Sequence, residues 1–121
     1  MTVIRFPRPD VPLNLNHRDH WSVRAKRTKA WRRTAWAEAF SQVPPPRTQP
    51  RSLVTVSIPV VGNRRRDAAN LSPTVKPIVD GLVDAGLWPD DTGEYVVTAE
   101  PVLVVGGTEV VVTLQAIEVA S

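Results

Sequence analysis

Charged residues in the middle of the chain are of the types needed for chemistry on a phosphate group. Asp67 directly follows the basic triplet Arg64–Arg66, Lys76 comes next, and Asp90 and Asp91 are adjacent. Carboxylate oxygens bind Mg²⁺, and a metal held against a phosphodiester polarises it and lowers the pKa of an attacking water. A lysine beside it neutralises the charge that develops on the phosphate. If these segments lie side by side in the fold, their side chains would form a phosphoryl-transfer site. If the segments lie apart, the aspartates are ordinary helix caps and solvated loop residues.

Whether the acids meet depends on the helix that separates them. An apolar stripe at helical spacing predicts this helix: Val75, Ile78, Val79, Leu82 and Val83. We expect Thr74 as its N-cap and Gly86 as its C′ residue, with Pro89 preventing continuation. A helix of about 12 residues spans about 18 Å, so its two ends lie far apart. Asp67 and Asp91 therefore meet only if segment 70–74 or segment 87–91 folds back.

Lys76 is the residue that folding alone explains least. With Thr74 as the cap it stands in the first turn, where the helix dipole disfavours a cation by about 0.3–1 kcal/mol. An anion should compensate. Asp80, one turn away, would be a purely structural partner, and Asp67, Asp91 or a bound phosphate are the other candidates.

The remaining sequence predicts a single domain, residues 1–121, with the element order β-α-β-α-β-β. This order predicts an α+β fold with two layers, a mixed sheet and helices on one face. The other helix is expected from an N-cap at Ser22 to about Gln42. Strands are expected over Thr2–Phe6, Leu53–Val61, Glu94–Val105 (broken near Pro101) and Thr108–Val119, with a hairpin turn at Gly106-Gly107.

The charges divide the chain into a cationic and an anionic half. Residues 1–66 hold 14 of the 15 Lys and Arg and three of the 12 acids. In the first helix the cations include Arg24, Arg27 and Lys29, which predicts a surface that binds a polyanion such as DNA. Trp21, Trp31 and Trp36 could stack on bases, but core packing is the expectation for each. The alternative is arginine-rich surface from a GC-rich coding source.

The sequence offers little support for disulfides, for a zinc site, or for secretion or membrane insertion. The chain has no cysteine, which excludes disulfides and thiolate metal sites. His17 and His20 flank Asp19, and a metal site there is conceivable; a polar loop is the simpler interpretation, because no further His or Cys completes a zinc shell. The lack of a signal-peptide pattern or membrane span predicts a cytoplasmic protein.

Residues 64–91 resemble the RusA family of Holliday-junction resolvases. The resemblance rests on these elements: Arg64-Arg65-Arg66-Asp67, Asn70-Leu71, Lys76, Asp80-Gly81-Leu82, Ala85-Gly86-Leu87-Trp88 and Asp90-Asp91. It implies a homodimeric, Mg²⁺-dependent endodeoxyribonuclease, bacterial or phage-encoded, that nicks opposed strands of four-way DNA junctions in recombination and repair. No small-molecule cofactor is implied.

The resemblance also assigns roles to residues. Asp67, Lys76 and Asp91 would be catalytic, and Asp67, Asp90 and Asp91 would hold Mg²⁺. The residues that would contact DNA are Arg64, Arg65, Arg66, Arg24, Arg27, Lys29 and Asn70. The family's second acid falls on Ala69, which cannot bind a metal, although Asp80 or Asp90 could supply the missing ligand. A branched-DNA-binding protein of the same fold without cleavage is the alternative, and a structural α+β domain is a third interpretation.

Overall fold

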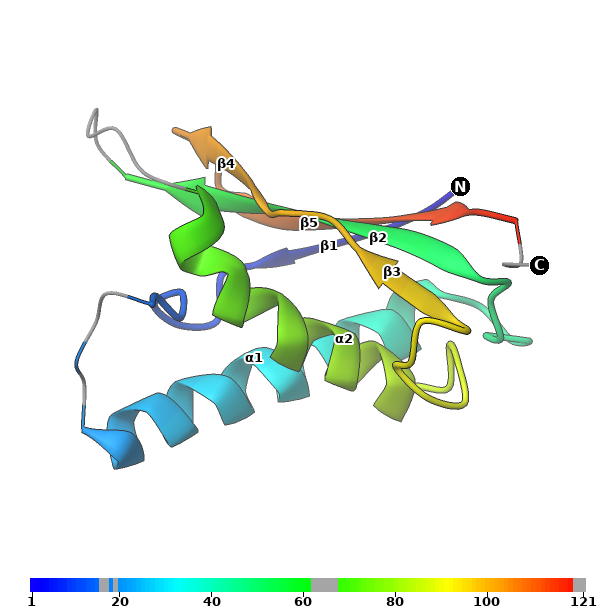
Figure 1. The fold of residues 1–121 in the computed structure, drawn as a ribbon, viewed down its shortest axis with the longest axis horizontal. Helices are drawn as coiled ribbons and strands as arrows, with labels where there is room; N and C mark the ends of the chain where they lie inside the picture. Colours follow the sequence, from blue (N-terminus) through cyan, green and yellow to red (C-terminus); the bar gives the residue numbers. More distant parts are fainter. Residues whose placement is uncertain (16–17, 19, 62–67, 119–121) are drawn as a thin grey trace.

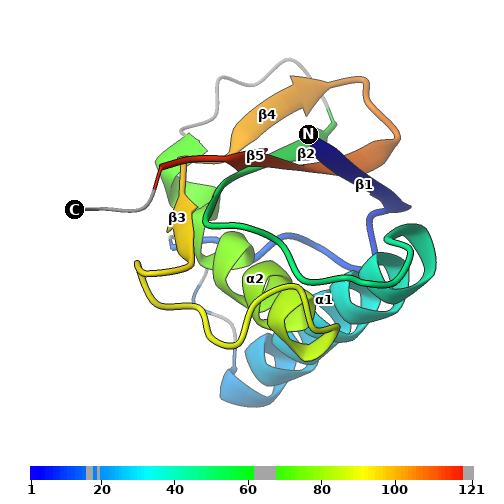
Figure 2. The same cartoon turned by 90° about the vertical axis from the view of Figure 1, so that its right-hand side faces the viewer.

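A mixed sheet with two α-helices packed on one of its faces makes up the computed structural model (Figures 1 and 2). The structure describes residues 1–121 except 16–17, 19, 62–67 and 119–121. Across the described residues the elements are β1 Thr2–Pro7, α1 Trp21–Gln42, β2 Ser52–Val60, the 3₁₀ helix η1 Ala68–Thr74, α2 Val75–Asp84, β3 Val96–Thr98, β4 Val102–Val105 and β5 Glu109–Ala116. The predicted α+β class and two-layer arrangement are confirmed.

Strand β2 is the centre of the sheet. It pairs with β5 in the antiparallel sense on one side, and with β3 and β4 in the parallel sense on the other, while β5 also pairs with β1. The predicted hairpin at Gly106-Gly107 is therefore wrong, because β4 and β5 lie on opposite sides of β2. The connection crosses the end of β2 instead, and the Gly106 amide donates to the Val60 carbonyl at 3.3 Å.

Alternating side chains of the strands form the core beneath the sheet. In β2, Val54, Val56 and Ile58 are fully buried, and Val56 lies level with Val112 of β5. Val112 in turn pairs with Ile4 of β1, so one apolar row crosses three strands. Each such side chain contributes about 1.5–3 kcal/mol by leaving water. The period-2 pattern that predicted these strands is the pattern that fills the core.

Helix α1 begins two residues earlier than predicted. Ser22 was expected as the N-cap, but His20 takes this position, and its ring nitrogen Nδ1 accepts from the Ser22 amide at 3.2 Å. The imidazole nitrogen thus does what a Ser or Asp oxygen usually does at an N-cap. The buried face of the helix consists of Trp31, Ala35 and Ala39, at helical spacing.

Helix α2 packs closely against α1 at Gly81. A Cβ atom placed on Gly81 would lie 2.3 Å from the Arg32 carbonyl oxygen and 2.8 Å from the Ala35 Cβ. Only a residue without a side chain allows the two backbones to approach this closely. This contact fixes the position of α2, and with it the position of Lys76 and Asp80, relative to α1.

Helix α2 begins where predicted, with Thr74 at its N-cap position, but the Thr74 side chain does not cap it. Thr74 is itself helical (φ −72°, ψ −29°) and its side chain makes no capping bond, because η1 leads directly into α2. The buried Thr74 hydroxyl donates instead to the Leu13 carbonyl at 2.9 Å. It therefore ties the loop after β1 to the start of α2.

Candidate active site at the first turn of α2

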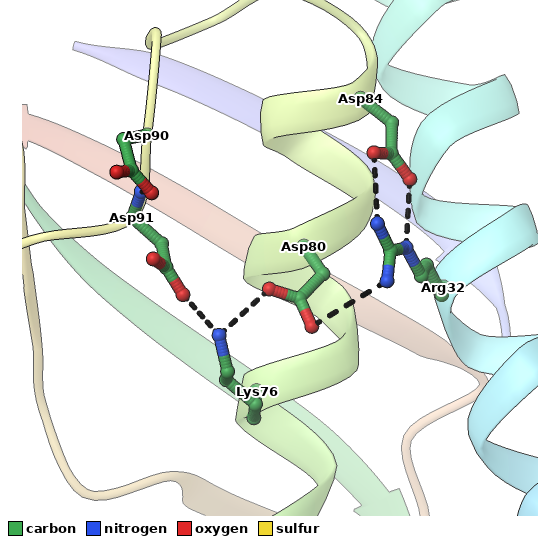
Figure 3. Close-up of polar contacts among 6 residues, drawn as sticks. All are labelled: Arg32, Lys76, Asp80, Asp84, Asp90 and Asp91. Carbon is green, nitrogen blue, oxygen red and sulfur yellow. Dashed lines mark hydrogen bonds and ion pairs between the residues drawn. The ribbon is translucent and has the colours of Figure 1, made fainter.

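Lys76 lies between two carboxylates. Its ammonium donates to Asp80 Oδ1 at 2.8 Å and also to Asp91 Oδ2 (Figure 3). The anion expected beside Lys76 is therefore present, and it comes from two of the predicted candidates at once. Asp80 belongs to the same helix, whereas Asp91 comes from the loop that follows it.

Asp91 reaches Lys76 because the chain after α2 turns back sharply. The Gly86 amide donates to the Val83 carbonyl at 2.9 Å, and the Leu87 amide donates to the Leu82 carbonyl at 3.2 Å. These two bonds form a Schellman motif, with Gly86 in the left-handed region at φ 93° as predicted for the C′ position. These bonds satisfy two carbonyls of the last helical turn, and the chain leaves in the direction of the sheet.

Two buried side chains then hold the returning loop. Leu87 and Trp88 belong to the core, the Trp88 indole donates to the Pro50 carbonyl at 3.0 Å, and the Gln49 amide donates to the Leu87 carbonyl at 2.7 Å. The segment before β2 therefore anchors the segment that carries the acidic pair. Of the two ways in which the acids could approach, the structure shows the return of segment 87–91.

The two acids of the loop have different contacts. The Asp91 amide donates to Asp90 Oδ1 at 2.7 Å, so Asp90 braces the backbone of its neighbour. Asp91 then directs its carboxylate to Lys76, while Asp90 stays exposed (Figure 3). Asp90 and Asp91 therefore place two carboxylate groups, whose oxygens can bind a metal ion such as Mg²⁺, next to each other on the loop.

The charges of this site stabilise one another. The hydrogen bond to Asp80 and then the bond to Asp91 raise the pKa of Lys76. The hydrogen bond from Lys76, followed by that involving Asp90, lowers the pKa of Asp91. At neutral pH Lys76 is therefore fully protonated and Asp91 fully ionised.

Arg32 of α1 extends the ion pairs toward the other helix. It bonds to both oxygens of Asp84 at 2.8 and 3.0 Å, and its Nη1 lies 3.9 Å from Asp80 Oδ2 (Figure 3). The hydrogen bond between Arg32 and Asp84 raises the pKa of Arg32 and lowers the pKa of Asp84. The pairing of Arg32 with Asp84 and Asp80 was not predicted from the sequence, although Asp80 and Asp84 stand four residues apart on one face of α2.

A groove opens beside Lys76 and Asp91. It has a volume of about 230 Å³, and its lining is made of residues from η1, α2, the returning loop and β3: Ser72, Val75, Lys76, Val79, Asp91, Val96 and Thr98. The groove is thus bounded by one cation, one anion, two hydroxyl side chains and three valines. A phosphate-bearing ligand could reach Lys76 from it.

The other predicted site residues are placed as follows. Arg64, Arg65, Arg66 and Asp67 lie outside the described residues, as do His17 and Asp19, and His20 caps α1. Asn70 lies in η1, where its carbonyl accepts from the Leu15 amide at 2.8 Å. On α1, Arg24 donates to the Asn14 carbonyl at 3.4 Å, Arg27 lies 3.8 Å from Asp10, and Lys29 is exposed.

The described residues gather fewer acids than the predicted metal site requires. Apart from residues 16–17, 19, 62–67 and 119–121, no three His, Cys, Asp or Glu side chains cluster closely enough to hold a metal ion. Asp67, the first predicted ligand, belongs to the segment left out. The described part of the predicted Mg²⁺ site is the pair Asp90 and Asp91.

Comparisons with known proteins do not assign a family. No family model, curated protein or solved structure matches the chain. Among the described residues, no helix is both long and apolar enough to cross a membrane.

Proposed function

We propose that this protein is a RusA-like, Mg²⁺-dependent endonuclease that cleaves four-way and other branched DNA. The observation that carries the proposal is the pairing of Lys76 with Asp91, which reaches it by the return of the chain from the far end of α2. The two residues match the family's lysine and later acid, and the fold brings them together beside a groove.

Lys76 would provide the positive charge at the reacting phosphate. Its ammonium has three protons and contacts two carboxylates, so the third proton can bind a phosphate oxygen from the groove. A lysine placed in this way stabilises the negative charge that develops during phosphodiester hydrolysis. Asp80 and Asp91 keep this ammonium charged and oriented.

The acids of the returning loop would hold the metal together with Asp67. Asp90 and Asp91 supply oxygen ligands of the kind that Mg²⁺ prefers, and the low pKa of Asp91 keeps it ionised at neutral pH. When bound, Mg²⁺ supplies Lewis acidity toward the phosphodiester and the attacking water. Lys76 occupies one oxygen of Asp91, which leaves the second oxygen for the metal.

The basic residues of the first half would hold the DNA backbone. Arg24, Arg27 and Lys29 of α1, with Arg64–Arg66 and Asn70, are the proposed contacts. We infer a homodimer, because two sites are needed to nick two opposed strands, and a bacterial cytoplasmic location for a host or phage enzyme.

Ala69 favours a second candidate, a branched-DNA-binding protein that does not cleave. It stands where the family has its second acid, and the described residues hold no cluster of three acids. This candidate uses the same basic surface and predicts tight junction binding without any metal-dependent nick.

One assay separates the two candidates. The protein is incubated with a labelled four-way junction in Mg²⁺ or in EDTA, and the reaction is repeated with Asp67→Asn. Paired nicks that need Mg²⁺ and disappear in the variant support the nuclease. Tight binding to the junction without nicks under any divalent metal supports the binding protein, and equal, weak binding to linear and branched DNA contradicts both.

A further inference from the structure

Two tryptophans of α1 lie on the surface. Trp21 is 76% exposed and Trp36 is 40% exposed, whereas Trp31 and Trp88 are buried in the core. The expectation of core packing is therefore wrong for Trp21 and Trp36. Large aromatic side chains left in water are an informative exception in a folded domain, and they often mark a binding surface.

A shallow groove connects these two rings along α1. It consists of two adjoining hollows that share Lys29 and Arg32; the first also contains Trp21 and the second contains Trp36. Fifteen residues of α-helix separate the two rings in sequence, which corresponds to about 22 Å along the axis. We call this surface, from Trp21 through Lys29 and Arg32 to Trp36 with Arg33 at its edge, the α1 groove.

The charge of the α1 groove is positive and is only partly neutralised. Arg32 is held by Asp84 and Asp80, which fixes its guanidinium in the groove. Lys29 and Arg33, in contrast, form no ion pair with any residue that the structure describes. Within α1, Glu38 is the one acid among six basic residues.

This combination specifies the chemistry of the ligand. Flat aromatic rings bind the faces of nucleobases, and free cations bind phosphates. A DNA duplex offers phosphates but keeps its base faces stacked inside. A second copy of the chain would bring two cationic grooves together, which like-charge repulsion opposes. A single strand with unpaired bases satisfies both the rings and the cations.

We propose that the α1 groove binds single-stranded DNA, with bases stacked on Trp21 and Trp36 and phosphates at Lys29 and Arg33. This inference rests on the proposed function, because branched DNA that opens at its junction supplies unpaired bases. The groove also connects to the candidate active site, because Arg32 bonds to Asp84 and lies near Asp80, the partner of Lys76. A strand held there would lie next to the helix that carries Lys76.

The test measures, by fluorescence anisotropy in EDTA, how tightly the protein binds a labelled oligothymidine strand. The strand has about 20 nucleotides, which is longer than most binding sites for single-stranded DNA. Trp21→Ala and Trp36→Ala should each weaken binding about fivefold or more, because each removes a stacking platform. Trp36→Phe should retain most of the affinity, since a ring remains. Val104→Ala is the matched control, because Val104 is also 40% exposed but lies on β4; it should bind like the wild type.

A strand of the same length without bases separates stacking from other effects. The wild type and both alanine variants should bind it equally, whereas Lys29→Ala and Arg33→Ala should weaken binding to both strands and reduce the salt dependence. The inference would be overturned if Trp21→Ala and Trp36→Ala bind oligothymidine like the wild type, or if they lose affinity equally for the strand without bases. If the wild type still cleaves the four-way junction in that case, the proposed function stands and only the α1 groove is misassigned; a wild type that binds neither strand nor junction contradicts both.

Discussion

The Asp91 carboxylate forms an ion pair with the Lys76 ammonium, although Lys76 lies in the first turn of α2 and Asp91 lies on the loop that follows the helix. The pairing depends on the Schellman motif at Gly86 and on the burial of Trp88, which together direct the loop back along α2. It also begins a series of alternating charges that runs through Asp80 to Arg32 on α1. The proposed endonuclease activity depends on this geometry.

Substitution of Lys76 should separate catalysis from stability. Lys76→Met removes the ammonium but keeps a chain of similar length, and we expect the nicking rate to fall about 10²–10³-fold, as when another transition-state donor is lost. The ion pairs are exposed, so stability should change by about 1 kcal/mol or less. Single-turnover kinetics and urea unfolding measure the two effects. Lys26→Met, on the exposed part of α1, is the control, and an unchanged rate in Lys76→Met would contradict the role of Lys76.

The ion pairs should make stability depend on pH at the acidic end. The pKa values of Asp84 and Asp91 are lowered from 3.8, so their contribution is present above that value and is lost as the pH falls below it. The pKa of Lys76 is raised from 10.5, so its contribution is lost only in strong alkali. We therefore expect the urea midpoint to fall between pH 5 and pH 2.

Asp84→Asn provides the internal comparison for this pH effect. The difference in midpoint between the wild type and Asp84→Asn should shrink as the pH falls, because the wild-type carboxylate then becomes neutral as well. A difference that stays constant from pH 5 to pH 2 would show that the pair with Arg32 adds no stability.

Gly81→Ala should destabilise the protein, although alanine is the better helix former. The added Cβ would lie 2.3 Å from a backbone oxygen of α1, so the helices must separate. Such overpacking costs about 1–3 kcal/mol, more than the gain of about 1 kcal/mol in helix propensity. Thermal unfolding measures the result. Gly93→Ala, where nothing lies within 4 Å of the new Cβ, should be close to neutral, and equal melting temperatures for the two variants would contradict the close helix contact.

Trp88→Phe should loosen the loop that carries Asp91. The change removes the indole donor to the Pro50 carbonyl, which keeps its bond from the Ser52 hydroxyl, and it leaves space in the core. We expect a loss of about 0.5–1.5 kcal/mol from the missing hydrogen bond, with a further loss from the space. Under conditions where the variant is fully folded, nicking should still be slower, because Asp91 is less well placed. Trp21→Phe, an exposed substitution, should leave stability unchanged. Faster or equal nicking by folded Trp88→Phe would argue against anchoring by this residue.

Much of the fold follows from local patterns in the sequence. Alternation along β2 predicted its buried face, and the apolar stripe with Gly86 predicted α2 and its end. The hairpin at Gly106-Gly107 failed because two glycines permit a turn but do not determine which strand becomes the neighbour. Thr74 was correctly placed just before the first residue of α2, but its side chain does not cap the helix. The preceding segment is already helical, and the Thr74 hydroxyl donates to the carbonyl of the distant residue Leu13.

The candidate site was predictable only in part. The position of Lys76 in the first turn indicated that an anion should be close, and this was correct. The direction of the loop after α2 depends on the burial of Trp88 against the Pro50 carbonyl, a contact between distant segments that local spacing does not encode. The exposure of Trp36 likewise depends on which face of α1 meets α2 at Gly81.

The most direct test of the central claim is the rate of paired nicking of a four-way junction in Mg²⁺ by Asp91→Asn compared with Asp84→Asn. Both variants lose one ionised carboxylate of the same series of ion pairs, but only Asp91 contacts Lys76. We predict that Asp91→Asn abolishes nicking while still binding the junction, and that Asp84→Asn nicks at nearly the wild-type rate. Equal nicking by both variants, or no nicking by the wild type, would contradict the account.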